Sequence, residues 1–140
     1  MRRSKTEIYL HLVWATAQRK QIITTPVERL LYRCIQNEVQ HLGCTVLALG
    51  GMPDHIHLVV QTPATISVAK LAQQVKGVSS TFARDQLTLE EPFQWQDNYA
   101  AFSISRSHLK RVVAYVRNQK QHHAAGRVWQ DWEESDEEVQ

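Results

Sequence analysis

Apolar and polar residues alternate near the start of the chain, over residues 8–16. On an extended backbone, Leu10 and Leu12 face one way, and Tyr9 and His11 face the other. This alternation predicts a β-strand with one buried side.

A helical period follows this strand. Apolar residues recur every three or four positions over residues 30–39, which predicts an amphipathic helix. Thr25 is its predicted N-cap, with Pro26 at the first helical position and Glu28 at the third, the pattern of a capping box. Gly43 is the expected end of the helix.

The rest of the chain continues to alternate between patterns typical of strands and patterns typical of helices. Two short apolar runs, residues 44–49 and 55–61, flank the turn sequence GGMPD and predict a β-hairpin. A second amphipathic helix follows, with Ser67 as its N-cap. We expect a last strand over residues 99–105 and a last helix over residues 106–123.

The predicted order is strand, helix, strand, strand, helix, strand and one further helix. The first six elements match the β-α-β-β-α-β arrangement of ferredoxin-like and RRM-like folds. We therefore expect an α+β domain with an antiparallel sheet, two helices on one face of it and the other face open. The first and third strands are expected to be its central pair.

Two histidines share one side of the third predicted strand. His55 and His57 are two residues apart, so both point to the open face, while Ile56, Leu58 and Val60 point into the core. Two neighbouring imidazoles can bind one divalent metal ion, but a third ligand must come from elsewhere in the chain.

The last predicted helix offers that third group. Tyr115, Gln119 and His122 lie on one stripe of this helix, beside its apolar stripe. Tyr115 is therefore not expected in the core. Its hydroxyl could serve as a nucleophile beside the amide oxygen of Gln119, or it could be solvated at the edge of the helix.

The distribution of charge along the chain indicates a class of binding partner. Six of the 14 acids lie in residues 131–140, so the preceding residues carry all 16 Lys and Arg against eight acids. A basic body with an acidic tail suggests a polyanion such as nucleic acid as the partner. The 140 residues suffice for one domain. We divide them into a domain over residues 1–130 and an acidic tail over 131–140.

Location follows from what the sequence lacks. It has no secretory signal and no apolar run of membrane-spanning length, and its cysteines, Cys34 and Cys44, do not have the spacing of a metal site. We expect a cytosolic protein that does not bind a membrane.

Several segments of the chain match the motifs of one family. GGMPDHIHL (50–58) and YVRNQKQHH (115–123) are similar to the histidine and tyrosine motifs of the single-tyrosine HUH transposases of the insertion-sequence 200/605 type, a resemblance that implies a bacterial or archaeal protein. VKGVSS (75–80), WQDNY (95–99) and HLVW (11–14) also fit, in order, and the match spans residues 8–123. Asn98 replaces the usual glycine, and Ala17-Gln18 replaces a common Lys-Tyr pair.

The resemblance implies a transposase that cleaves and rejoins single-stranded DNA and mobilises an insertion sequence. Tyr115 would be the nucleophile and form a 5′-phosphotyrosine, and His55, His57 and Gln119 would bind Mg²⁺ or Mn²⁺. The DNA would carry hairpin ends. The protein would be a homodimer in which the tyrosine helix of one subunit completes the histidine site of the other. The basic residues expected to contact DNA are Arg19, Lys20, Lys70, Lys76, Arg84, Arg106 and Lys110.

Three alternatives are consistent with the same residues. One is a domesticated, repeat-associated HUH endonuclease that cuts DNA without moving its own element. Another is a non-catalytic RNA- or single-strand-binding module that uses the open RRM-like sheet. A third is a metal-dependent hydrolase that uses His11 with His55 and His57.

Overall fold

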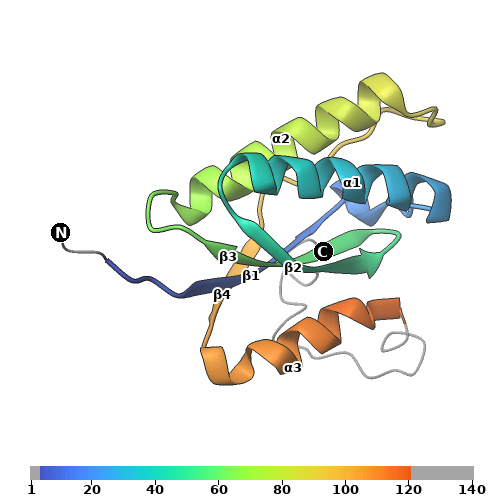
Figure 1. Ribbon diagram of the computed structural model, residues 1–140. Helices are drawn as coiled ribbons and strands as arrows, with labels where there is room; N and C mark the ends of the chain where they lie inside the picture. The colour runs from blue at the N-terminus through green and yellow to red at the C-terminus, as the bar shows by residue number, and fades with distance from the viewer. Residues whose placement is uncertain (1–3, 121–140) are drawn as a thin grey trace.

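The computed structural model describes residues 4–120 and confirms the predicted order of elements. Three helices and four strands form one unit, with a short 3₁₀ helix, η1, after the first strand (Figure 1). In chain order the elements are β1 (Ile8–Ala15), η1 (Ala17–Arg19), α1 (Thr25–His41), β2 (Thr45–Met52), β3 (His55–Thr62), α2 (Val68–Gln86), β4 (Ala100–Ile104) and α3 (Arg106–Arg117).

All neighbouring strands of the sheet are antiparallel, in the order β2-β3-β1-β4. The predicted central pair, β1 and β3, is confirmed. Its register pairs Val13 with His57 and Ala15 with His55. The sheet therefore places the histidine pair beside the C-terminal end of β1.

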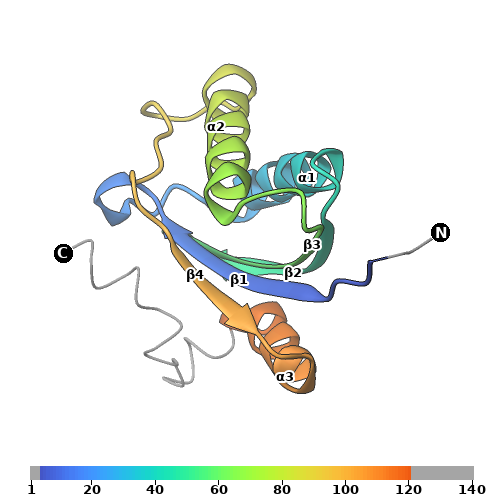
Figure 2. The same cartoon turned by 90° about the vertical axis from the view of Figure 1, so that its left-hand side faces the viewer.

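The two long helices, α1 and α2, cover one face of the sheet (Figure 2). Between them and the sheet lies the larger hydrophobic core, which contains the alternate β3 residues Ile56, Leu58 and Val60 as predicted. Leu12 and Trp14 of β1 are in the same core and are fully buried. The period-two pattern of both strands therefore identified their core-facing sides correctly.

The other face of the sheet is not open, which corrects the sequence prediction. Helix α3 lies across it, on the side opposite to α1 and α2 (Figures 1 and 2). Val112 and Val116 of α3 pack with Ala48 and Val59 of the sheet in a second, smaller core. The reason is that this face carries apolar residues, among them Ala48 and Val59, beside its histidines, and the apolar stripe of α3 is buried against them.

The ends of the helices agree with the prediction in part. Ser67 caps α2, and its hydroxyl accepts a hydrogen bond from the Lys70 amide at 3.1 Å. Helix α1 has Thr24 as its N-cap, without a side-chain cap bond, so the capping box predicted on Thr25 does not form. Helix α3 ends at Arg117, with Asn118 as its C-cap. Residues 119 and 120 are again helical, and the rest of the predicted helix, 121–123, lies outside the described residues.

Two sequence predictions fall on parts of the chain without a described structure. His122 and the acidic tail, and with them the domain boundary at residue 130, lie outside the described residues. Within residues 4–120, no helix has both the length and the apolar character needed to cross a membrane.

Candidate functional site

The two histidines of β3 lie side by side beneath α3. Their ring centroids are 5.2 Å apart, and both side chains point away from the larger core, as predicted. They are nevertheless buried, with His55 1% and His57 0% exposed. The site is therefore an enclosed contact between the sheet and α3, rather than an exposed sheet face.

His55 is held by a carboxylate from the turn before β3. Its Nδ1 lies 2.8 Å from Asp54 Oδ1, and the other oxygen, Oδ2, accepts from Arg19 Nε at 3.1 Å and Nη2 at 2.9 Å. Burial raises the pKa of Asp54, but the hydrogen bonds and charges of His55 and Arg19 outweigh it and hold that pKa below its usual value. The ionised carboxylate can only accept, so Nδ1 of His55 donates to it.

Arg19 reaches Asp54 because of an unusual backbone turn. Gln18 and Arg19 both have a positive φ, 58° and 55°, which is uncommon for residues other than glycine. The turn is tied to the start of β3, where the Thr16 amide donates to the carbonyl of Asp54 at 2.9 Å. Sequence reasoning assigned Arg19 to DNA and missed Asp54, because this turn brings together residues 35 positions apart.

His57 is held by a second imidazole instead of a carboxylate. Nε2 of His11, on the neighbouring strand β1, lies 2.8 Å from Nδ1 of His57. The two rings are stacked, with centroids 5.0 Å apart, and His11 is 1% exposed. His11 thus lies beside the pair as expected, and its contact with Nδ1 makes it a partner of His57.

Tyr115 of α3 lies directly against this histidine pair. Its ring is edge-on to His57, with centroids 5.9 Å apart and an interplanar angle of 78°. It is 1% exposed and belongs to the smaller core, so the expectation that it lies outside the core is wrong. Tyr115 and Gln119, which lie on the stripe beside the apolar one, are both buried because α3 packs closely on the sheet.

Glycine at position 50 allows this close packing. Gly50 of β2 is paired with His57, and a Cβ at Gly50 would overlap the carbonyl oxygen of Val116 in α3. Only a residue without a side chain permits this approach. Gly50 therefore sets the position of the residue next to Tyr115 against the sheet.

Gln119 is the remaining predicted ligand, and it follows the C-cap of α3. It is 1% exposed, so an amide is buried one turn beyond Tyr115. Among residues 4–120, no group of three His, Cys, Asp or Glu side chains is arranged to hold a metal ion. His11 instead contacts Nδ1 of His57, which does not favour the alternative of a three-histidine hydrolase site, and Gln119 stays a predicted ligand.

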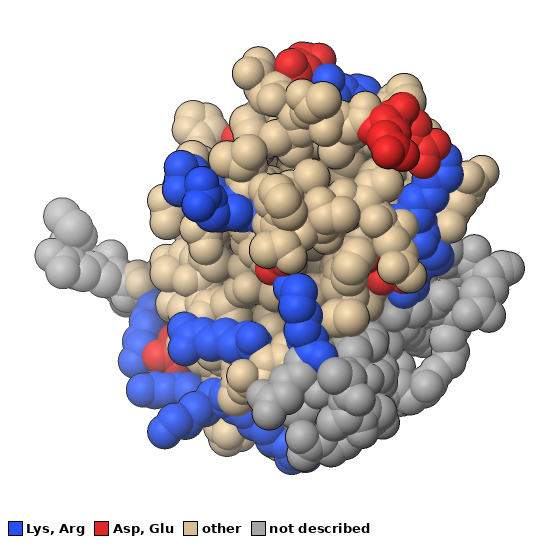
Figure 3. All heavy atoms as spheres, turned by 90° about the vertical axis from the view of Figure 1, so that its right-hand side faces the viewer, with Lys and Arg blue, Asp and Glu red and all other residues tan. Residues whose placement is uncertain are grey.

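The predicted DNA-contacting residues do not form one surface. Lys70, Lys76 and Arg84 lie on α2, whereas Arg106 and Lys110 lie on α3, across the sheet. On the face in Figure 3, one larger group of Lys and Arg lies near the bottom, and uncharged surface separates it from the others. Net charge is a sum, so it could not predict this division.

Several of these basic groups also have partners within the protein. Lys20 forms an ion pair with Glu91 at 2.6 Å, and Arg106 pairs with Glu7 at 3.5 Å. Lys76 donates to the carbonyl oxygens of Gln96 at 2.5 Å and Asn98 at 3.0 Å. Lys76 therefore positions the loop before β4, a role that the sequence did not suggest.

Comparisons with known proteins show which family this chain is similar to. The family model described as IS200-like transposase matches residues 4–119. The ISDra2 transposase TnpA of Deinococcus radiodurans is 23% identical over 118 residues, which are 81% of this chain and 84% of that protein. The residues matched by the family model span the positions of the histidine pair, Tyr115 and Gln119.

Two solved structures share the fold. One is a crystal structure of a candidate transposase of Deinococcus radiodurans, with a TM-score of 0.66 and 22% identity, covering 91% of this chain and 98% of that one. The other is a REP-associated tyrosine transposase bound to a REP hairpin, with a TM-score of 0.65 and 17% identity, covering 91% and 74%. Since the family model spans most of the chain, including the buried contact between the histidine pair and Tyr115, the protein belongs to the IS200-like transposase family.

Proposed function

We propose that this transposase-family protein cleaves and rejoins single-stranded DNA through Tyr115. The observation that carries the proposal is the buried contact between Tyr115 and His57, within a chain whose family model spans residues 4–119. A tyrosine on the edge of a histidine pair combines a nucleophile with groups able to bind a cation next to a phosphate.

The proposed step exchanges one phosphodiester for another. The hydroxyl oxygen of Tyr115 forms a bond to phosphorus, the bond from phosphorus to the 3′-oxygen breaks, and the proton lost by tyrosine balances the proton gained by the 3′-hydroxyl. The products are a 5′-phosphotyrosine and a free 3′-hydroxyl. Because the covalent link is again a phosphodiester, another 3′-hydroxyl can reverse the step without ATP.

The donor set of this site fits a divalent metal ion. His55 and His57 would bind through Nε2, since Nδ1 of each ring faces Asp54 or His11, and the Gln119 amide oxygen would be the third ligand. Two imidazoles favour Mn²⁺, and an oxygen ligand is also compatible with Mg²⁺. When bound, the ion would supply positive charge that neutralises charge building on the phosphate.

The substrate is proposed to be single-stranded DNA with hairpin ends. A structural neighbour of this chain is a tyrosine transposase bound to a REP hairpin. Tyr115 is 1% exposed, and a nucleophile enclosed in this way favours a flexible strand over a rigid duplex. The same two observations favour hairpins in which the cleaved phosphate lies in an unpaired segment.

We also propose that the protein acts as a homodimer with shared active sites. Only Ser105 separates β4 from α3, and α3 packs in a core that is much smaller than the main one. An element that packs through a small core can exchange between two copies while keeping the same contacts. In the exchanged form, Tyr115 would contact His57 of the partner subunit instead of its own.

The direct test of the proposed function is Tyr115→Phe. This change removes one hydroxyl and keeps the ring that packs against His57, so we expect a folded protein that binds DNA and forms no covalent adduct. Labelled single-stranded and fully paired DNA are incubated with each protein and separated on denaturing gels. An adduct that persists in the Phe variant would exclude Tyr115, and efficient cutting of paired DNA would contradict the proposed substrate.

A repeat-associated endonuclease is the second candidate for the protein's biological role. It is favoured by the structural similarity to the REP-associated transposase. Its chemistry would be the same, but the protein would not mobilise its own element. Imperfect palindromes at both ends of the gene would favour an active element, and their absence would favour the repeat-associated role.

A further inference from the structure

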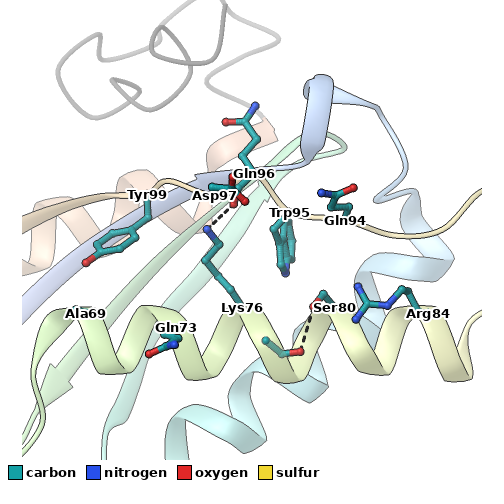
Figure 4. Close-up of a pocket in the computed structure, with 11 residues that line it drawn as sticks. Ala69, Gln73, Lys76, Ser80, Arg84, Gln94, Trp95, Gln96, Asp97 and Tyr99 are labelled. Carbon is teal, nitrogen blue, oxygen red and sulfur yellow. Dashed lines mark hydrogen bonds between the residues drawn. The ribbon is translucent and has the colours of Figure 1, made fainter.

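A groove lies between helix α2 and the segment that precedes β4, which we call the α2 groove (Figure 4). Its volume is about 340 Å³. The α2 side is formed by Gln73, Lys76 and Arg84, and the opposite side by Trp95, Asp97 and Tyr99. The groove lies on the helical face of the sheet, away from the contact between His57 and Tyr115.

The walls of the α2 groove are fixed to each other by hydrogen bonds. Lys76 donates from α2 to the carbonyl oxygens of Gln96 and Asn98, as the dashed line to Gln96 in Figure 4 illustrates. The indole Nε1 of Trp95 donates to the Ser79 hydroxyl at 2.9 Å. These bonds span both walls, so the groove is formed before any ligand enters, which lowers the entropic cost of binding.

The side chains in the groove match the parts of a nucleotide. The partly exposed ring of Tyr99 offers a surface on which a base can stack. The amide of Gln73 and the carboxylate of Asp97 can bond the polar edge of a base, and the Arg84 guanidinium can bond a phosphate. A carboxylate in the groove disfavours a phosphate as its sole ligand and favours a base with amino or imino donors.

The position of the groove is suited to the proposed substrate. Trp95 forms a β-bridge with Thr16, the residue after β1, and β1 ends where Ala15 is paired with His55. The segment then continues into β4, the edge strand from which α3 follows. The groove and the histidine pair are therefore joined through the same end of the sheet.

We propose that the α2 groove binds an unpaired base of the single-stranded DNA substrate, which stacks on Tyr99 and bonds Gln73 and Asp97, while Arg84 contacts the adjoining phosphate. This inference rests on the proposed function, because it assigns part of the same DNA to a second place on the protein. The groove selects the base, and the histidine site carries the chemistry.

The test compares DNA strands that have bases with one that has none. Four labelled homopolymeric deoxyoligonucleotides and an abasic strand of equal length are titrated with the full-length Tyr115→Phe protein, and affinity is measured by fluorescence anisotropy. We expect at least one homopolymer to bind roughly five-fold or more tightly than the abasic strand, the effect of one stacked base. Equal binding of all five strands would overturn the proposal.

Variants of groove residues then test whether this preference for strands with bases arises in the α2 groove. Gln73→Ala changes an exposed helical residue and leaves the fold intact, and we expect it to reduce or alter the preference among homopolymers. Tyr99→Leu keeps apolar packing but removes the ring. We expect the ratio of the affinity for the preferred homopolymer to the affinity for the abasic strand to fall close to one. A base preference that survives both changes would overturn the proposal.

Two arginine variants distinguish binding of the base from a general effect of charge. Arg84→Gln is expected to lower the affinity for all strands, the abasic one included. Arg33→Gln makes the same change on α1 and is the matched control, which should keep the base preference and most of the affinity. If Arg33→Gln lost as much DNA affinity as Arg84→Gln, the effect would be one of general positive charge, and the result would contradict a phosphate contact in the groove.

Two further measurements distinguish the remaining explanations. If free nucleoside monophosphates compete as well as the strands do, the groove takes a free nucleotide and the assignment to DNA is overturned. The covalent-adduct assay with wild-type Tyr115 is scored separately. No adduct with any DNA would contradict the proposed function, whereas an adduct without any base preference would contradict only the α2 groove.

Discussion

The two histidines of the pair, His55 and His57, have different hydrogen-bonding partners. His55 faces a carboxylate, and His57 faces the imidazole of His11. The spacing of His55 and His57 predicted their common side, because the period of a strand is two residues. It could not predict Asp54 as the partner of both His55 and Arg19, because that contact depends on the positive-φ turn at Gln18 and Arg19.

Asp54→Asn is expected to lower stability in a pH-dependent way. The folded pKa of Asp54 is below its usual value, so its contribution to stability is present above the unfolded pKa of about 4 and is lost as pH falls through the lower folded pKa. The free energy of unfolding of the wild type should exceed that of the variant by about 1.5–3 kcal/mol at neutral pH, the effect of hydrogen bonds to a charged group. Urea unfolding across a pH series measures this difference.

The exposed residue Asp85 on α2 provides the matched control for this measurement. Asp85→Asn makes the same chemical change outside the site, and we expect a much smaller effect on the free energy of unfolding. A gap between wild type and Asp54→Asn that stays constant down to strongly acidic pH would show that the carboxylate charge is not the cause.

At the scale of elements, the site depends on how α3 packs on the sheet. The apolar stripe of α3 was evident from the sequence, and Val112 and Val116 are buried as that stripe predicts. What the stripe could not indicate is the distance of approach, which Gly50 on β2 allows. The burial of Tyr115 follows from this approach and not from the helix alone.

Gly50→Ala is therefore expected to displace α3 from the sheet. The added methyl group would overlap the Val116 carbonyl, and overpacking of this kind typically costs about 1–3 kcal/mol. We also expect less covalent adduct, because Tyr115 moves with the helix. Gly77→Ala is the control for stability alone, since its Cβ would meet nothing within 4 Å, and in a helix it should add about 0.5–1 kcal/mol of stability. Equal effects of the two changes would contradict this account.

The register of β3 makes a second prediction at this scale. Ile56 is fully buried in the larger core, so Ile56→Asp should unfold the protein by placing a charge there. His57→Ala should fold with reduced stability, because His57 is buried beneath α3, and it should lose adduct formation. Circular dichroism with thermal melting compares the variants, and a folded Ile56→Asp beside an unfolded His57→Ala would mean that the register is shifted by one residue.

At the scale of the whole molecule, local periodicity predicted the order of elements and the central strand pair well. Whether the second face of the sheet is exposed or covered was not predictable in this way, because it depends on where a helix far along the chain packs. That face carries Tyr9, His11 and Val13 on β1, a mixed set that is compatible with either solvent or a helix. The same limit applies to the distribution of charge, since the basic residues Arg84 of α2 and Arg106 of α3 lie on elements at opposite faces of the sheet.

The exchange of α3 between subunits gives the last prediction. Tyr115→Phe and the double variant His55→Ala/His57→Ala damage different parts of the site. If α3 acts on the partner, a mixed dimer has one site with both changes and one with neither, and the intact site forms an adduct on the subunit that carries the histidine changes. We expect this result, because an exchanged helix keeps the contact of Tyr115 with His57.

The experiment uses subunits of different length, so that the adduct can be assigned on a denaturing gel, and allows time for subunits to exchange. Each variant alone is the control and should give no adduct. If α3 acts only on its own chain, every site in the mixture keeps a change and no adduct forms. A silent mixture, with mixed dimers demonstrated independently, would therefore reject the shared site while leaving Tyr115 as the nucleophile, since that role is tested by Tyr115→Phe alone.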